Sequence, residues 1–311
     1  MAAACTEPVA AHPCNPSRRA FLTVLASGAA LAACGDWRAG RGTPRVGLAL
    51  GGGGARGLAH IPFLELLDEM KVRPHRIAGT SIGAVLGTLY AAGRSGREIR
   101  ELMTGLVGDG RGEGLLHGSY RWIEYIDLAM GGGGLLDTDD FLQFLHGALR
   151  HDTFAELAIP MRVVAADLWS REPVVFSSGE MLPALKATIA LPGLFKPVPY
   201  RGHLLVDGGV VNPVPWDLLD DCDVVVALDV SGQRTHQRGE VPGVIESVFL
   251  SFHAMEEALV AEKLRCSRPD LYIKPPIKDI RVMDFQRAGE IYDQAKPALQ
   301  ELRWGLKRLL G

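Results

Sequence analysis

Short apolar runs alternate with helical patterns along most of this chain, and this alternation restricts its possible folds more than any other feature. An apolar run bounded by turn residues is typical of a strand that is buried on both faces. The predicted strands are residues 46–50, 77–79, 161–166, 173–177, 203–206 and 224–230. The predicted helices are residues 56–70, 82–92, 97–106, 139–149 and 244–264. Strands and helices in this order predict an α/β fold with a largely parallel central sheet.

The length of the chain favours a single folded domain. Its 311 residues, 47% of them hydrophobic, can bury one large core. We expect this domain over residues 45–311, after a Gly/Arg-rich linker over residues 34–44. A glycine-rich insertion over residues 105–134 interrupts the alternation. The insertion is either a mobile cap whose aromatic residues touch acyl chains or an ordinary segment packed on the domain.

The charge of the chain excludes two classes of partner. A formal net charge of −3 leaves no basic surface for nucleic acid and no polybasic segment for anionic lipid. We expect no nucleic-acid partner, and any contact with a membrane must have another origin.

Residues 1–33 are expected to form an export signal. Arg18 and Arg19 precede an apolar run over residues 20–33, which is shorter than the ~20 residues of a bilayer span. The paired arginines resemble a twin-arginine signal, and the Leu-Ala-Ala-Cys that ends at Cys34 resembles a lipobox, the site where bacterial lipoproteins are cleaved and acylated. We therefore expect lipid on Cys34 to anchor the protein to a membrane of the bacterial cell envelope, facing the periplasm. The alternative is a buried helix followed by an ordinary thiol.

A glycine-rich loop joins the first predicted strand to the first predicted helix. Gly52, Gly53 and Gly54 let backbone N–H groups turn toward a ligand, and the following helix adds its positive end, so the loop is suited to binding an anion. The spacing to Gly57 also matches a dinucleotide-binding loop, but no carboxylate follows the second strand, where such a site needs one. Arg56 either binds a phosphate or carboxylate of the substrate or holds the loop through a salt bridge.

A Gly-Thr-Ser-Ile-Gly segment lies at the next transition from strand to helix. Gly79 and Gly83 flank Ser81 and allow the strained turn that exposes a nucleophilic serine at a helix N-terminus. A serine that attacks a carbonyl needs donors for the oxyanion that develops, and the amides of residues 52–54 can supply them. The two glycine-rich segments therefore predict one site for acyl transfer.

The base of Ser81 has two candidates in the sequence. Asp207 ends an apolar strand, and Gly208 and Gly209 turn the chain after it, which suits a Ser-Asp dyad. A carboxylate with a pKa of ~3.9 is a weak base, so burial or the substrate would have to improve it. The alternative is a triad of Ser81, Asp207 and His236, although His236 lies in a polar segment.

The glycine loop, the Gly-Thr-Ser-Ile-Gly segment and the Asp-Gly-Gly turn, in this order, resemble the patatin-like phospholipase family. The intervening stretches that are also similar to this family are residues 154–160, 165–168 and 187–195. The resemblance implies a three-layer α/β/α sandwich, with Ser81 as nucleophile, Asp207 as proton acceptor and the amides of residues 52–54 as the oxyanion hole. This chemistry needs no metal, and the sequence has no His/Cys/Asp cluster with ligand spacing, so we expect no cofactor and no metal ion. Pro62, inside the first predicted helix, departs from a regular helix and leaves the loop geometry open.

These observations together predict a serine lipid acyl hydrolase that cleaves carboxylic esters in the manner of a phospholipase A or lysophospholipase. Its expected partners are a lipid or phospholipid substrate and the membrane that holds its N-terminal anchor. Two alternatives are an acyltransferase that uses the same acyl-enzyme and a lipid-anchored binding protein with a degenerate site.

Overall fold

The computed structural model describes residues 43–107, 145–149, 151–233, 235 and 241–311. Within these ranges one eight-stranded sheet has the order β5-β6-β3-β2-β1-β7-β8, and β4 pairs with β3 beside this path. The strands are β1 (Val46–Leu50), β2 (Arg76–Thr80), β3 (Met161–Asp167), β4 (Pro173–Phe176), β5 (Val198–Tyr200), β6 (His203–Asp207), β7 (Val224–Leu228) and β8 (Leu271–Ile273). Strands β3, β2, β1, β7 and β8 are parallel, whereas β4, β5 and β6 run antiparallel to their neighbours. The predicted α/β fold with a largely parallel sheet is confirmed.

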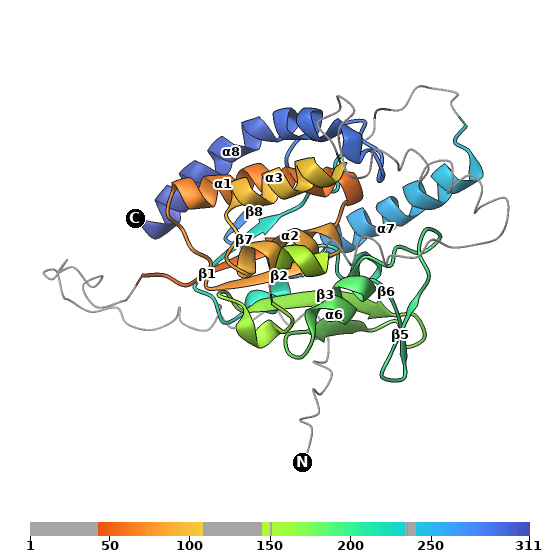
Figure 1. Cartoon of the computed structure of the whole chain (residues 1–311). Coiled ribbons are helices and arrows are strands. Elements are labelled where there is room, and N and C mark those ends of the chain that lie inside the picture. Colours follow the sequence, from red (N-terminus) through yellow and green to blue (C-terminus); the bar gives the residue numbers. More distant parts are fainter. Residues whose placement is uncertain (1–42, 108–144, 150, 234, 236–240) are drawn as a thin grey trace, which may run out of the picture.

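Helices cover both faces of the sheet and give the molecule three layers. The helices are α1 (His60–Glu69), α2 (Ile82–Ala91), α3 (Gly96–Val107), α6 (Met181–Thr188), α7 (Val244–Cys266) and α8 (Ala288–Leu310). Short 3-10 helices include η1 (Gly54–Ala59), η4 (Gly208–Val210) and η5 (Trp216–Leu219). Helices α1, α3 and α8 lie together on one side (Figure 1), while apolar residues of η5 and α7 pack on the opposite face.

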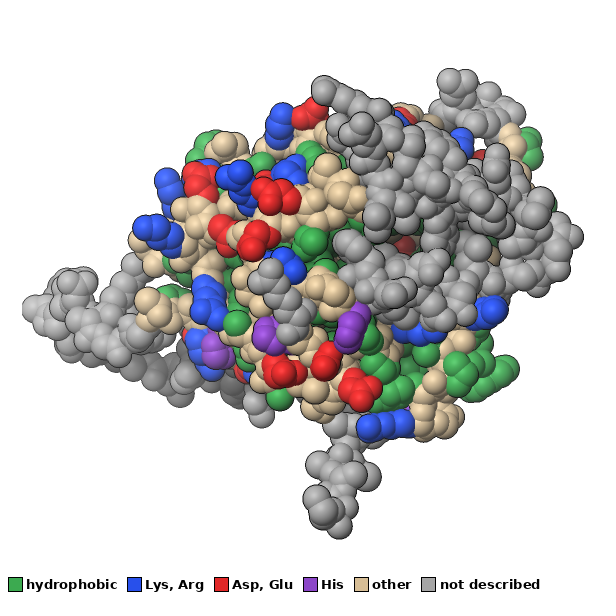
Figure 2. Space-filling model, in the orientation of Figure 1, with side chains coloured by type: hydrophobic (Ala, Val, Ile, Leu, Met, Phe, Trp, Pro, Cys, Tyr) green, Lys and Arg blue, Asp and Glu red, His purple; other side chains and the backbone are tan. Residues whose placement is uncertain are grey.

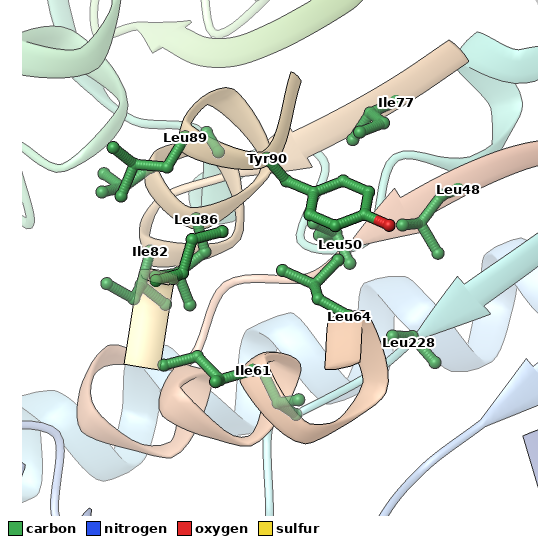
Figure 3. Packing of buried hydrophobic residues seen from close by; sticks show 14 of the residues in the cluster. Leu48, Leu50, Ile61, Leu64, Ile77, Ile82, Leu86, Leu89, Tyr90 and Leu228 are labelled. Carbon is green, nitrogen blue, oxygen red and sulfur yellow. The ribbon is translucent and has the colours of Figure 1, made fainter. Parts of the chain in front are cut away.

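The strands alternate in the side chains that they present to these two layers. Leu48 and Leu50 of β1 belong to the large cluster, and Figure 3 shows them beside residues of α1 and α2. Ala49 belongs to the smaller cluster, together with Ala78 of β2 and Ala227 of β7. Because successive strand residues point to opposite faces, leucine lies on one side and alanine on the other. The central strands are thus buried on both faces, as their apolar runs predict.

The surface over α1, α3 and α8 carries interspersed charges of both signs (Figure 2). Arg100 of α3 pairs with Glu65 of α1 at 2.5 Å, and Arg303 of α8 pairs with Glu69 of α1 at 2.8 Å. Partly exposed pairs of this kind contribute at most about 1 kcal/mol each. The packing of these helices therefore depends mainly on their apolar faces.

Strand β3 brings the ends of β2 and β6 together. Thr80, the last residue of β2, pairs with Val164, and Asp207, the last residue of β6, pairs with the next β3 residue, Ala165. Strand β4 pairs with both of these β3 residues, and a strand has only two edges. Consequently β2 and β6 share the other edge of β3 and meet end to end. This register places the residue that follows Thr80 beside Asp207.

The predicted helix over residues 56–70 begins differently from expectation. Its first part is the 3-10 helix η1, and α1 starts only at His60. Pro62 is buried in the first turn of α1, where a missing N–H removes no helical hydrogen bond. The proline therefore does not break the helix.

Several predicted segments lie outside the part of the chain that the structure describes. They are the export signal over residues 1–33, Cys34, most of the linker and the insertion beyond residue 107. Of the helix predicted over residues 139–149, residues 145–149 are described and are helical. No helix among the described residues is both long and apolar enough to span a membrane.

Candidate active site

Ser81 occupies a strained turn between β2 and α2. Its backbone has φ 53° and ψ −130°, a region that non-glycine residues rarely adopt. The Ser81 N–H donates to Thr188 Oγ1 at 2.8 Å, and that hydroxyl donates to the Val164 carbonyl. These bonds hold the serine at the end of the sheet, in the geometry that a nucleophile elbow requires.

Three glycines around this turn allow backbones to approach closely. A Cβ added to Gly83 would lie 2.4 Å from the Leu50 carbonyl oxygen, and one added to Gly79 would lie 2.6 Å from the backbone of α2. A Cβ on Gly57 would lie 2.0 Å from a methyl group of Ile82. The glycines of both motifs thus bring β1, η1 and α2 into contact.

The side chains of Ser81 and Asp207 are hydrogen-bonded to each other. Ser81 Oγ donates to Asp207 Oδ2 at 2.6 Å, and the Gly209 N–H donates to Asp207 Oδ1 at 2.8 Å. The Asp207 side chain is buried, and this burial raises its pKa to about 7, with a further contribution from the Glu256 carboxylate. A carboxylate with this pKa is a far stronger base at neutral pH than an exposed aspartate.

The glycine loop approaches Ser81, but its amides are not equivalent. The Gly52 N–H donates to the Pro213 carbonyl at 3.0 Å, so it is already engaged and the prediction of a free oxyanion donor at Gly52 is wrong. Gly52 instead brings the loop close, because a Cβ there would lie 3.4 Å from Ser81 Cβ. Among the described hydrogen bonds, the N–H groups of Gly53 and Gly54 have no acceptor. These two amides are the donors that the loop leaves for an oxyanion.

Arg56 points back into the glycine loop. Its side chain is only 8% exposed, its Nε donates to the Gly53 carbonyl at 3.2 Å, and Nη1 lies 3.4 Å from His253 Nε2. Burial lowers the pKa of the guanidinium. Of the two roles considered for Arg56, these contacts favour support of the loop, through a carbonyl rather than a salt bridge.

His60 of α1 supports the start of the glycine loop, at Gly51. It is fully buried, and its Nε2 lies 2.8 Å from the Gly51 carbonyl oxygen. Burial lowers the pKa of the imidazole to about 4, so the ring is neutral and donates its Nε2 proton to that oxygen. His60 thereby fixes the peptide that precedes the oxyanion donors.

The loop after Asp207 is anchored to both β2 and α7. Thr80 Oγ1 donates to the Asn212 carbonyl at 2.7 Å. Lys263 of α7 donates to Asn212 Oδ1 at 2.7 Å and to the Val214 carbonyl at 2.8 Å, while its ammonium lies 4.2 Å from the ring centre of Trp216. In the same turn a Cβ on Gly208 would lie 2.3 Å from a β3 carbonyl oxygen. The position of Asp207 is therefore set from three directions.

Histidine does not contact Ser81 in the described part of the chain. His203 Nδ1 lies 2.9 Å from Asp167 Oδ2, where the last residue of β3 meets the first residue of β6, away from Asp207. His236, the histidine of the alternative triad, lies outside the described residues. The carboxylate of Asp207 is the base that the described geometry offers to Ser81.

Four residues at this site were not identified as functional from the sequence: Thr188, His60, Lys263 and Glu256. Thr188 lies in the stretch over residues 187–195 that resembles the family, so the sequence held a pattern that could have indicated its role. The other three carry no local motif, because tertiary packing alone brings them to the site.

The comparison with protein families agrees with this geometry. The sequence model described as patatin-like phospholipase matches residues 48–220, which is more than half of the chain. The chain belongs to the patatin-like phospholipase family. The matched region includes Ser81, Asp207 and the glycine loop.

Several relatives are much longer than this chain. An uncharacterised NTE family protein of Mycobacterium tuberculosis is 33% identical over 197 residues, which cover 63% of this chain and 51% of that protein. Patatin-like phospholipase domain-containing protein 6 of Homo sapiens is 27% identical over 283 residues, which cover 80% of this chain and 20% of that protein. Among solved structures, VipD from Legionella pneumophila has a TM-score of 0.47 and 16% identity, covering 83% of this chain and 67% of that chain. This chain thus spans about half of the mycobacterial protein and a fifth of the human one. Membership of the family supports a lipid hydrolase.

Proposed function

We propose that this protein is a serine lipid acyl hydrolase that cleaves carboxylic esters of phospholipids or lysophospholipids through a Ser81–Asp207 dyad. The observation that carries the proposal is the 2.6 Å hydrogen bond from Ser81 Oγ to a buried carboxylate whose pKa is raised to about 7. The family supplies the lipid class of the substrate.

In the first half of the reaction Asp207 takes the proton of Ser81 as Oγ attacks the ester carbonyl carbon. The carbonyl oxygen becomes an oxyanion, for which the Gly53 and Gly54 amides are the available donors. Removing one such donor typically costs about 2.7–4 kcal/mol of transition-state stabilisation. Asp207 then gives the proton to the leaving alcohol as the bond to the acyl carbon breaks, leaving an acyl-serine.

In the second half a water molecule attacks the acyl-serine. Asp207 accepts a proton from this water, and the same amides hold the second oxyanion. Collapse releases the fatty acid and returns the proton from Asp207 to Ser81 Oγ. The serine proton that leaves with the alcohol is thus replaced by a proton from water, and Ser81 and Asp207 regain their starting states without a histidine.

The site of action is proposed from the sequence. A lipid-modified Cys34 would hold the domain at a bacterial membrane, where its substrates are concentrated. Metabolic labelling with a palmitate analogue tests the anchor, and incorporation that persists in Cys34→Ala would contradict it.

Product analysis on native membranes tests the activity. Wild-type protein should release free fatty acid and lysolipid, or free fatty acid from lysolipid, whereas Ser81→Ala should release none above background. Equal release by both proteins would contradict the proposal. If the acyl groups are found mainly on an acceptor other than water, the proposed activity becomes acyl transfer through the same acyl-enzyme.

A further inference from the structure

A second buried carboxylate lies at the turn that carries Asp207. Glu256 of α7 is 8% exposed, and its Oε1 lies 2.3 Å from the position of a Cβ added to Gly209. That same position is 3.2 Å from Asp207 Oδ1. The two carboxylates therefore approach within roughly 6 Å across Gly209, the range over which like charges alter each other's ionisation. Glu256 Oε1 also lies 3.9 Å from the corresponding position on Gly52, so it borders the glycine loop as well.

His253 and Arg56 connect Glu256 to the oxyanion side of the site. Arg56 Nη1 lies 3.4 Å from His253 Nε2, and His253 Nδ1 lies 3.9 Å from Glu256 Oε2. A guanidinium has only donors, so His253 Nε2 accepts and its ring proton is on Nδ1, facing Glu256. The same Arg56 donates to the Gly53 carbonyl. Polar groups thus lie one after another between the glycine loop and the Asp207 turn, with 3.9 Å between His253 Nδ1 and Glu256 Oε2.

Glu256 is the carboxylate best placed to balance the charge of Arg56. Arg56 is a buried cation bonded to a carbonyl and an imidazole, and a buried cation is costly without a counter-charge. Among the carboxylates that raise the pKa of Arg56, Glu256 acts most strongly. Burial raises the pKa of Glu256 above its ordinary value, and His253 and Arg56 offset only part of this rise. Glu256 is therefore the partner that lets a charged Arg56 remain in the loop.

We propose that Glu256 is a positioning residue for the dyad: it neutralises Arg56 beneath the oxyanion loop and, from its place across Gly209, makes Asp207 a stronger base. This inference rests on the proposed function. A negative charge beside Asp207 increases the proton affinity of that carboxylate, so Asp207 removes the Ser81 proton more readily once it is itself ionised.

The charged and titratable groups that face Glu256 come from η1, the β6–η4 turn, the end of β7 and α7 itself: Arg56, Asp207, Asp229 and His253. Asp229 is paired with Lys274 at 3.6 Å and with the Tyr272 hydroxyl. The oxygens of Asp207 are bonded to Ser81 and Gly209, and not to a cation. Asp207 therefore has no cation beside it that would offset the charge of Glu256.

The test is the pH profile of kcat/KM for a soluble p-nitrophenyl acyl ester, with the full chain and Glu256→Gln. Glutamine keeps the shape and removes the charge. The midpoint of the acid limb should move down by about 1 pH unit, and the plateau should fall by roughly tenfold because Asp207 becomes a weaker base. Glu262→Gln is the matched control, since Glu262 lies on the same helix with a side chain 64% exposed, and its profile should equal that of wild type.

A loss of rate with an unmoved midpoint in Glu256→Gln would overturn the inference, because a merely structural role lowers the rate without moving the limb. If Glu256→Gln does not fold, Glu256→Asp replaces it, because the shorter side chain withdraws the charge from Gly209. The midpoint should then also move down, and an unmoved midpoint would contradict the proposal. If wild type is active and the variants keep its midpoint, only the role of Glu256 is refuted. Absence of any Ser81-dependent hydrolysis in wild type refutes the proposed function and this inference together.

Discussion

Asp207 differs from an ordinary aspartate because it is buried without a cation. Its two oxygens accept from the Ser81 hydroxyl and the Gly209 N–H, yet these bonds lower its pKa less than burial raises it. The result, a pKa of about 7, is the basicity that the proposed dyad requires in the absence of a histidine. This basicity lowers the stability of the folded state when Asp207 is ionised, since an ionised carboxylate is then held away from water.

Replacing Asp207 by asparagine should stabilise the fold in a pH-dependent way. The unfolded chain ionises this group near 3.8 and the folded protein near 7, so the folded state binds the extra proton between these values. The stability contributed by Asp207 is therefore complete below about pH 4 and is lost as the pH rises through about 7. In Asp207→Asn, Oδ1 can still accept from Gly209 and Nδ2 can donate to Ser81 Oγ.

Urea unfolding measures this effect. At about pH 8 Asp207→Asn should be more stable than wild type by on the order of 2–4 kcal/mol. Near pH 4 the two proteins should be equally stable. A difference that does not change with pH would show that Asp207 is not a buried carboxylate of raised pKa.

At the residue scale, local sequence identified Ser81 but not its surroundings. Glycines on both sides and the change from strand to helix made Ser81 a candidate on its own. Asp207 depended on the family resemblance, because an Asp-Gly-Gly turn has many uses. His60 and Glu256 carry no motif, and they become neighbours of the site only when α1 and α7 pack against the sheet.

At the scale of elements, the approach of α2 to β1 determines where Ser81 lies. Gly83, in the first turn of α2, faces the carbonyl oxygens of Leu50 and Gly51, which a Cβ would meet at 2.4 and 2.5 Å. Both contacts are with backbone, which cannot move aside as a side chain can. The glycine is required by this contact rather than by its own φ.

Gly83→Ala should therefore push α2 away from the sheet. We expect a loss of about 1–3 kcal/mol in the free energy of unfolding, the usual cost of overpacking, and loss of labelling of Ser81 by a fluorophosphonate. Gly105→Ala is the matched control, because Gly105 lies in α3 and a Cβ there meets nothing within 4 Å. That variant should gain up to about 1 kcal/mol from helix propensity, and a Gly83→Ala protein as stable and as reactive as this control would contradict the packing argument.

Element prediction succeeded for segments with a clear apolar run and failed for α8 and for the shortest strands. The predicted strand over residues 46–50 coincides with β1, since four apolar residues and Gly47 lie between turn signals. Helix α8 was not predicted, because its buried stripe includes Ala295 and Ala298 and surrounds Pro297. Strands β5 and β8 have three residues each, which is too short for a periodic pattern.

At the scale of the whole molecule, the site exists because β2 and β6 meet end to end along one edge of β3. This meeting joins residues that are 126 positions apart in the chain. Alternation of strands and helices predicts a parallel sheet, but it does not predict which strand ends meet. The order of the sheet follows from the packing of all the elements, which is why the family resemblance was needed to join Ser81 to Asp207.

The pH dependence of Ser81 labelling by a fluorophosphonate tests the central claim, that Asp207 is the base of Ser81. In wild type the labelling rate should rise with pH through a midpoint of about 7, where Asp207 ionises. In Asp207→Asn the rate should fall by roughly 10²–10⁴-fold and lose this midpoint. A labelling rate that keeps its value and its midpoint in Asp207→Asn, and is lost in His236→Ala, would contradict the account.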